Sequence, residues 1–409
     1  MLLRWLEVKR FRNLKPTRLD FQNGLNVFLG KNGSGKTTLL EIVTAITTDD
    51  FSRLEDDEEE FALAWALEST DEEEVRLEVT YARTRHFDTS GSRGNVDTAM
   101  RWARRLELTI HSREGVEYLV GDGSRFTYTF QDHAPLYFHS DSSRGEPQRQ
   151  ALLSMVEVPP EPLAWQEVLR FFSEDQPGRF DEALGCLGWL CARELHLVVD
   201  TRNRVVVGSE AARDVLRSWI GQEGFPEGRR VKFDAFGYEG GVEVGAELGF
   251  EHVEVEPQVV QRNRKDAYLV LKLSGIEFRF YTDAESFVTQ DKLSFGQKRM
   301  FSLLAYLALR RGPLVLDEPA NGLHYDWILR MFELIEGRQT FLATQHPFLL
   351  DHVPVISKDA VKQGFFRCRV EDKTLAVRGF TDDEAQRMVD AYDAGFQQLS
   401  EVLRAEQLW

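Results

Sequence analysis

The chain has 409 residues, enough for a large apolar core and two or three structural units. Its formal net charge of −17 argues against a protein that coats nucleic acid with its whole surface, although a local basic groove is compatible with it. The apolar runs fall short of the roughly 18 residues that cross a bilayer, and the three cysteines form neither an even disulfide set nor a metal cluster. We therefore expect a cytoplasmic protein with no membrane partner.

Strands are predicted to dominate the N-terminal third. Residues 2–11 and 25–29 are expected to be strands, and the second runs into a glycine-rich turn that a helix follows from 37 to about 46. The acidic run 55–60 is expected to be a solvated loop or the start of a helix. Alternating apolar residues predict further strands over 75–138.

The rest of the chain is predicted to alternate between helix and strand, which indicates an α/β sheet. The expected elements are a mostly helical segment at 161–222, strands within 230–281, a helix at 295–310, a buried strand at 313–317, a strand at 341–344, a hairpin at 364–378 and a last helix at about 382–404. We divide the chain into the parts 1–150, 151–290, 291–350 and 351–409.

The glycine-rich turn, called the phosphate loop below, carries the first motif. It fits G-x-x-x-x-G-K-[ST] in full, through Gly30, Lys31, Asn32, Gly33, Ser34, Gly35, Lys36 and Thr37. Glycines let backbone N–H groups turn around phosphate oxygens, and the N-terminus of the next helix adds partial positive charge. Lys36 is expected to neutralise the β- and γ-phosphates of ATP, and the Thr37 hydroxyl to ligate Mg²⁺. A turn that binds no ligand is the alternative.

A carboxylate pair ends the apolar run 313–316. Such a run is typical of a parallel strand buried on both faces, and ligands bind at the carboxyl ends of such strands in open α/β sheets. Asp317 is expected to hold Mg²⁺, directly or through water, and Glu318 to polarise the attacking water as general base. A surface acidic turn is the alternative, which the phosphate loop in the same chain disfavours.

A third motif is the segment Leu293-Ser294-Phe295-Gly296-Gln297. Taken alone, it predicts a helix capped by Ser294 and Gln297, and a capped core helix is the simplest interpretation. With the other motifs it resembles the LSGGQ signature of ABC-type ATPases, with Phe295 replacing the first glycine of the pair. His346, which follows the apolar residues 341–343, resembles the switch histidine of that family and is expected to contact the γ-phosphate; a structural histidine is the alternative.

The subgroup is read from two further segments. Residues 8–14, with Arg12 and Asn13, resemble the opening of RecF, SMC and OLD-type DNA-transaction ATPases, in which that segment lies beside the nucleotide. Residues 317–324 resemble the E-P-x-N-G-L-H form of AAA-type, OLD-like proteins rather than the form of transporter ATPases. There is no heptad run for long coils, and the residues after His346 lack the clustered acids of a Toprim nuclease site.

The resemblance implies a P-loop NTPase of the ABC-ATPase head type. This is an α/β fold whose mixed sheet carries a helical insertion between the phosphate loop (the Walker A motif) and the signature. The resemblance implies nucleotide contacts from Arg12, Asn13, the phosphate loop with Thr38, and residues 294–297 of a second copy. The implied partner is that second copy, joined head to tail when ATP binds. Gln148 and Gln150 are weak candidates for the family's Q-loop glutamine.

The resemblance also implies the function classes. The first is a RecF- or OLD-like ATPase, a dimer switch that acts on DNA in repair or phage defence. The alternatives are a regulatory ATPase that controls a separately encoded nuclease or other effector and, less favoured, a transporter ATPase subunit. Three basic clusters are candidates for contacting DNA or are solvated faces: Arg101, Arg104 and Arg105; Arg229, Arg230 and Lys232; and Arg262, Arg264 and Lys265.

Overall fold

The structure is a computed structural model of the whole chain. It describes residues 1–52, 54, 60–69, 75–87, 100–112, 115–122, 125–130, 136–139, 178–180, 185–192, 194–200, 205–207, 227–228, 230, 233–234, 238–265, 268–310, 312–353, 357–394 and 398–405. The chain divides into a first unit, made of Met1–Gly178, Arg311–Ala320 and Met331–Trp409, and a second unit, made of Arg179–Arg310 and Asn321–Arg330. This division is not sequential, because the first unit recruits segments from both ends of the chain.

A five-stranded mixed sheet forms the centre of the first unit. Strand β3 (Leu25–Leu29) pairs in parallel with β17 (Thr340–Ala343) on one side and with β18 (Phe365–Glu371) on the other. Strands β16 (Leu314–Asp317) and β19 (Thr374–Gly379) complete it as β16-β17-β3-β18-β19. The predicted buried strand and C-terminal hairpin are thereby confirmed, and the parallel strands end at one edge of the sheet.

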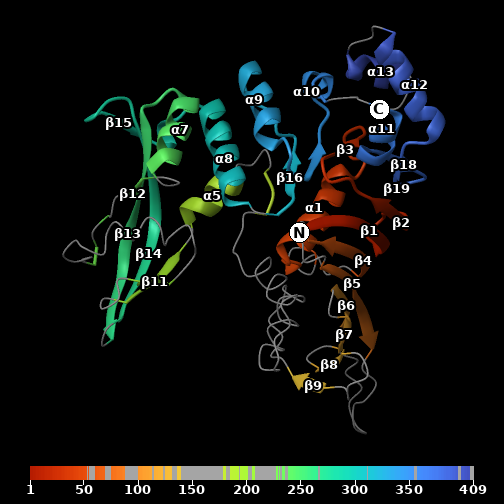
Figure 1. Cartoon of the computed structure of the whole chain (residues 1–409), viewed down its shortest axis with the longest axis horizontal. Coiled ribbons are helices and arrows are strands. Elements are labelled where there is room, and N and C mark those ends of the chain that lie inside the picture. The colour runs from red at the N-terminus through yellow and green to blue at the C-terminus, as the bar shows by residue number, and fades with distance from the viewer. Residues whose placement is uncertain are drawn as a thin grey trace. The chain divides into compact units, whose positions relative to one another are not determined.

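Helix α1 (Lys36–Thr48) starts directly after the phosphate loop and follows β3 in the chain (Figure 1). Its apolar side chains, including Leu39, Leu40 and Ile46, are fully buried. They belong to one continuous apolar core that also contains Phe28 and Phe341 of the mixed sheet. Because α1 is fixed by this core, the N-terminus of the helix and the loop before it have a defined position.

A second, eight-stranded antiparallel sheet belongs to the same unit and shares that core. Its order is β2-β1-β4-β5-β6-β7-β8-β9. The strands are β1 (Leu2–Phe11), β2 (Thr17–Asp20), β4 (Phe61–Glu68), β5 (Arg76–Phe87), β6 (Met100–Ser112), β7 (Gly115–Asp122), β8 (Arg125–Phe130) and β9 (Leu136–His139). Alternate residues such as Leu77, Val79 and Tyr81 are buried, which confirms the strands predicted over 75–138 from their alternation.

The second unit is built on a six-stranded sheet. Its strands are β10 (Leu195–Asp200), β11 (Val205–Val207), β12 (Phe233–Asp234), β13 (His252–Lys265), β14 (Tyr268–Tyr281) and β15 (Phe287–Thr289). Helices α5 (Gly185–Ala192), α7 (Tyr238–Leu248) and α8 (Phe295–Leu309) belong to this unit (Figure 1). Phe301 of α8 packs edge-on against Phe278 and Phe280 of β14, with ring centroids 4.9 Å apart in both pairs. Helix α8 thus covers one face of the sheet.

Two sequence predictions for this unit were wrong in part. The segment 161–222 was expected to be mostly helical, but within its described residues only α5 is a helix, whereas β10 and β11 are strands. Both are apolar runs rich in valine, a residue that favours the pleated surface of a sheet, and β10 pairs with β14 and β11. Helix α7 lies where only strands were expected. The insertion predicted to be helical therefore contains much strand.

The C-terminal region of the chain is helical around the hairpin β18–β19. Helices α9 (Tyr325–Ile335), α10 (Pro347–Asp351) and α11 (Lys358–Gly364) precede the hairpin. The single last helix expected at about 382–404 is instead α12 (Asp382–Asp393) and α13 (Leu399–Ala405). None of the helices within the described ranges is long and apolar enough to cross a lipid bilayer.

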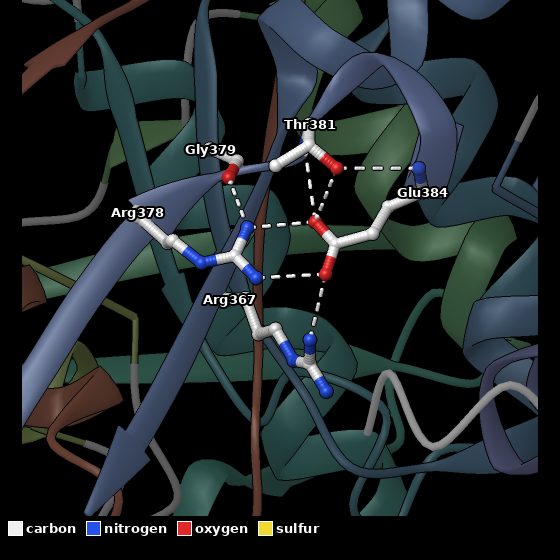
Figure 2. Close-up of polar contacts among 5 residues, drawn as sticks. All are labelled: Arg367, Arg378, Gly379, Thr381 and Glu384. Carbon is white, nitrogen blue, oxygen red and sulfur yellow. Dashed lines mark hydrogen bonds and ion pairs between the residues drawn. The ribbon is translucent and has the colours of Figure 1, made fainter. Parts of the chain in front are cut away.

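A partly buried ion-pair cluster joins the hairpin to α12 (Figure 2). Arg378 of β19 donates two hydrogen bonds of 2.7 Å to the Glu384 carboxylate, and Arg367 of β18 donates one of 2.8 Å. Thr381 and Glu384 form a capping box at the start of α12. The hydrogen bonds from Arg378, and then from Thr381, outweigh burial and lower the pKa of Glu384 to about 2. The folded state therefore binds the ionised carboxylate much better than the protonated one.

We expect Glu384→Gln to lower the free energy of unfolding by about 1–3 kcal/mol at pH 7. The reason is that the glutamine amide has no negative charge to pair with Arg367 and Arg378. A carboxyl group whose pKa is lower in the folded state contributes its full stability above its unfolded pKa, near 4.5. That contribution to folded-state stability is lost as the pH falls towards 2. The difference in the free energy of unfolding between the variant and the wild type, measured by urea unfolding, should therefore shrink as the pH falls from 4.5 towards 2. Glu401→Gln, at an exposed glutamate of α13, is the matched control and should be near neutral. An equal effect of both substitutions contradicts the prediction.

Candidate active site

The phosphate loop joins β3 to α1 and packs on the hairpin β18–β19. A Cβ at Gly30 would lie 2.4 Å from the carbonyl oxygen of Cys368 and 2.4 Å from Ser34 Oγ, so only glycine fits there. Gly35, the residue before α1, has φ 93°, and a Cβ on it would lie 2.8 Å from Leu375 Cδ1. Gly30 and Gly35 are therefore required by close packing, whereas Gly33, with φ 74° and nothing within 4 Å of a Cβ, is favoured by its backbone conformation alone.

Lys36 is buried at the centre of the loop. Its ammonium Nζ donates hydrogen bonds to the carbonyl oxygens of Gly30, at 2.7 Å, and Lys31, at 3.3 Å. Burial lowers the pKa of Lys36, while the negative charges of Glu318 and Asp317 act in the opposite direction. The cation and the predicted carboxylate pair therefore influence one another electrostatically within the first unit.

The loop also holds a buried polar atom with no partner. Ser34 is 3% exposed, and its Oγ forms no hydrogen bond with the described residues. A buried hydroxyl normally has a partner, because leaving it unpaired costs about 1–3 kcal/mol. A phosphate oxygen is a suitable acceptor for it. At the first turn of α1, Thr37 is exposed and Thr38 half-buried, so the predicted Mg²⁺ ligand faces outward.

Asp317 and Glu318 lie at the end of β16, opposite the end of β17. The register pairs Asp317 with Ala343 and Ala343 with Phe28, which brings the ends of β16, β17 and β3 to one edge. Asp317 is 8% exposed. Glu318 has φ 47°, a left-handed conformation that costs a non-glycine residue about 1 kcal/mol or more. Its N–H donates to the carbonyl of Ala343 at 2.8 Å, which helps to hold this conformation.

The Glu318 carboxylate is held by the residues that follow β17. The Thr344 hydroxyl and the Gln345 N–H each donate to Glu318 Oε2 at 3.1 Å. The Gln345 side-chain amide donates to Glu318 Oε1 at 3.3 Å and also to Asn32 Oδ1 of the phosphate loop. Sequence reasoning did not single out Gln345. The signal available was its place two residues after β17, a strand that ends at the ligand-binding edge.

His346 lies next to Gln345 but has different contacts. It precedes α10 as its N-cap residue, and its N–H donates to Thr344 Oγ1 at 3.0 Å. Its ring lies edge-on to Phe348, with centroids 6.4 Å apart. The ring atom Nδ1 is buried and has no hydrogen-bond partner among the described residues. The structure thus places the predicted switch histidine at the same edge of the sheet as Glu318.

Arg12 and Asn13 bond to the two elements that pack beside the phosphate loop, helix α1 and the hairpin β18–β19. Arg12 has φ 46° and forms a 3.0 Å ion pair with Glu41 of α1. The Asn13 amide donates to the carbonyl of Lys373 at 3.2 Å, and its carbonyl accepts from the N–H of Leu375 at 2.8 Å. These residues therefore brace α1 and the hairpin turn that packs against Gly35.

The signature segment belongs to the second unit, at the start of α8. The predicted capping box is confirmed, because Ser294 and Gln297 exchange the two expected hydrogen bonds. Gln297 also donates to the carbonyl of Leu248 at 3.2 Å. Phe295 is 57% exposed, and its ring packs closely on Gly322. A Cβ on Gly322 would lie only 2.3 Å from Phe295 Cε1. The segment therefore presents an aromatic ring at a helix N-terminus.

Several sequence candidates lie elsewhere. Gln148, Gln150, Arg229, Lys232 and most of the acidic run fall outside the described residues. Of the basic residues that are described, Arg105 pairs with Glu107, and Arg230 donates to the carbonyls of Glu256 and Gly275. Arg262 and Arg264 of β13 are both exposed.

The chain is similar in sequence to several known proteins. A family described as "AAA domain, putative AbiEii toxin, Type IV TA system" matches residues 25–351. The chain is 28% identical over 192 residues to the DNA replication and repair protein RecF of Proteus mirabilis, which covers 42% of this chain and 52% of that protein. It is 54% identical over 43 residues to RecF of Streptococcus pneumoniae, over 10% of this chain and 12% of that one. The chain thus matches about half the length, or less, of these relatives.

Among the solved structures with some similarity are two SMC heads. One is bound to the C-winged helix domain of ScpA, with TM-score 0.40, 12% identity and coverage of 94% of this chain and 100% of that one. The other is the SMC head domain from Thermotoga maritima, with TM-score 0.36, 13% identity and coverage of 93% and 100%.

The mixed sheet with a phosphate loop between β3 and α1 defines a P-loop NTPase fold. The matched residues span most of the chain, so this chain belongs to the AAA-domain family named above.

We expect Gly30→Ala to lower the free energy of unfolding by about 1–3 kcal/mol, because the new methyl group would meet the Cys368 carbonyl and displace the loop. Gly24→Ala, before the same strand, is the matched control, since nothing lies within 4 Å of a Cβ there. Urea unfolding of both variants measures the difference. If the alanine is tolerated equally at both positions, the close packing of loop and hairpin is not a constraint.

Proposed function

We propose that the chain binds and hydrolyses ATP at the phosphate loop, with Glu318 as the general base. The observation that carries this proposal is the meeting of three groups at one sheet edge: a buried Lys36, a glycine-lined loop, and a carboxylate oriented by Thr344 and Gln345. Such an arrangement suits phosphoryl transfer, where the protein contributes mainly positioning and electrostatic stabilisation.

The loop residues would bind the triphosphate. Backbone N–H groups from Gly30 to Gly35 and the N-terminus of α1 would donate to phosphate oxygens. Lys36 would exchange its carbonyl acceptors in the loop for the β- and γ-phosphates, and the buried Ser34 hydroxyl would gain an acceptor. Thr37 and Asp317 would hold Mg²⁺, which when bound neutralises charge on the phosphates.

Glu318 would then accept a proton from the attacking water. Its two oxygens are fixed by donors from residues 344 and 345, so little motion is needed to align it. We further propose that a second copy completes the site with Ser294–Gln297, head to tail. In that arrangement ATP would hold the two copies together and hydrolysis would release them, which makes the cycle a switch.

Two variants separate binding from turnover. Lys36→Ala should lose ATP binding, because the buried cation that faces the phosphates is removed. Glu318→Gln should bind ATP as the wild type does and lose turnover by about 100-fold or more, since the amide cannot accept the proton. Equilibrium binding of a fluorescent ATP analogue and phosphate release measure the two steps. Undiminished turnover in Lys36→Ala would falsify the proposed site.

Glu318→Gln also tests the dimer. With ATP and Mg²⁺ this variant should run as a dimer in size-exclusion chromatography, because the bound nucleotide persists. A strict monomer that binds ATP tightly would contradict the switch and leave the ATP site in place.

We propose DNA as the macromolecular partner of this ATPase. The relatives named as DNA replication and repair proteins support this assignment. The exposed pair Arg262 and Arg264 on β13 supplies a local positive charge in a chain of net charge −17. Phosphate contacts of this kind depend strongly on salt.

Duplex DNA should raise the rate of ATP hydrolysis severalfold at low salt, and the stimulation should decline steeply as salt rises. The double variant Arg262→Ala, Arg264→Ala should lose most of it. The matched control is Arg18→Ala, at an exposed arginine that pairs with Asp20. An ATPase rate indifferent to DNA at every salt concentration favours the second candidate function, an ATPase that regulates a separate effector protein. The family description, which names a toxin, is the observation that supports this candidate.

A further inference from the structure

Gln345 bridges the two halves of the candidate active site. Its side-chain amide donates one hydrogen bond to Glu318 Oε1 and another to Asn32 Oδ1 in the phosphate loop. Its backbone N–H donates to Glu318 Oε2. A glutamine amide has two N–H donors. Here the amide donates both to Asn32 of the phosphate loop and to Glu318, the proposed general base.

The neighbouring His346 makes no comparable link. Its backbone N–H donates to Thr344 Oγ1, and its carbonyl oxygen accepts from the N–H of Leu350. Its Nδ1 is buried without a partner in the described part of the chain, and its ring faces Phe348. The residue in contact with both the loop and Glu318 is therefore the one before the predicted switch histidine.

We propose that Gln345, the residue before the predicted switch histidine, is a positioning residue that couples the phosphate loop to Glu318. This inference rests on the proposed ATPase function. The amide links Asn32 to Glu318 Oε1, so the position of Asn32 in the loop helps to fix the orientation of the carboxylate. Thr344 supports the same carboxylate from the other oxygen and also fixes the backbone of His346.

The chemistry explains why an amide suits this position. A glutamine keeps one charge state at all physiological pH values, so it donates to Glu318 under every condition. A neutral histidine has a single N–H donor and could bond only one of the two partners at a time. The link through Gln345 therefore does not depend on protonation.

The test compares Gln345→Ala, Gln345→Asn and the matched control Gln386→Ala, which removes an exposed glutamine of α12 whose side chain donates to Asp390. Gln345→Ala should lower kcat by about 10- to 100-fold, the loss expected for a hydrogen bond to a charged group, while the Kd for ATP changes less than about threefold. Gln345→Asn, with a shorter side chain, should recover part of kcat because it can retain one of the two bonds. Gln386→Ala should match the wild type.

A double-mutant cycle with Asn32→Ala makes the test specific. If the two side chains act through one link, the double variant should lose no more kcat than the more severe single variant, whereas independent effects would multiply. Wild-type kcat in Gln345→Ala, together with a loss confined to His346→Ala, overturns the inference and leaves the ATPase intact. An inactive wild-type chain, with no turnover for Lys36→Ala to abolish, instead refutes the proposed function and the inference with it.

Discussion

Strand β3 has parallel neighbours on both sides, and this pairing decides which residues meet beyond its carboxyl end. On one side β17 and β16 end in register with it, so residues 318 and 344–346 follow at the same edge. On the other side β18 and β19 carry Cys368 and Leu375 against the loop glycines. A shift of β16 or β17 by one residue would displace the carboxylate, and a shift of β18 or β19 would displace the side chains that pack on the loop.

The parts of the fold that follow from local rules were predictable. The phosphate loop, the capped start of α8 and the hairpin β18–β19 each depend on residues close together in the chain. Helix α7 was missed because its glycines have low helix propensity. Its Gly245 is nevertheless required, since a Cβ there would lie 2.7 Å from His252 Cα of the next strand. Here tertiary packing overrides the local preference.

The candidate site was predictable for a different reason, and only in part. Lys36, Asp317 and Glu318 belong to motifs whose residue types are dictated by triphosphate chemistry. Gln345 carries no such motif, and its contacts join residues 313 and 27 positions away, which no local pattern encodes. The same holds for the Arg367–Glu384–Arg378 cluster, where a capping box predicts the helix start but not the arginines that reach it.

The non-sequential assembly of the first unit has a consequence for biosynthesis. Gln339, beside β17, bonds to Leu3 across 336 residues, and β3 acquires both its neighbours only from the last part of the chain. On the ribosome, β3 emerges long before them, with two unpaired edges that can pair wrongly. Interactions over such long separations form slowly. Translation must therefore be almost finished before the phosphate loop has its support, and a prematurely terminated chain would be a substrate for chaperones or proteases rather than a partly working protein.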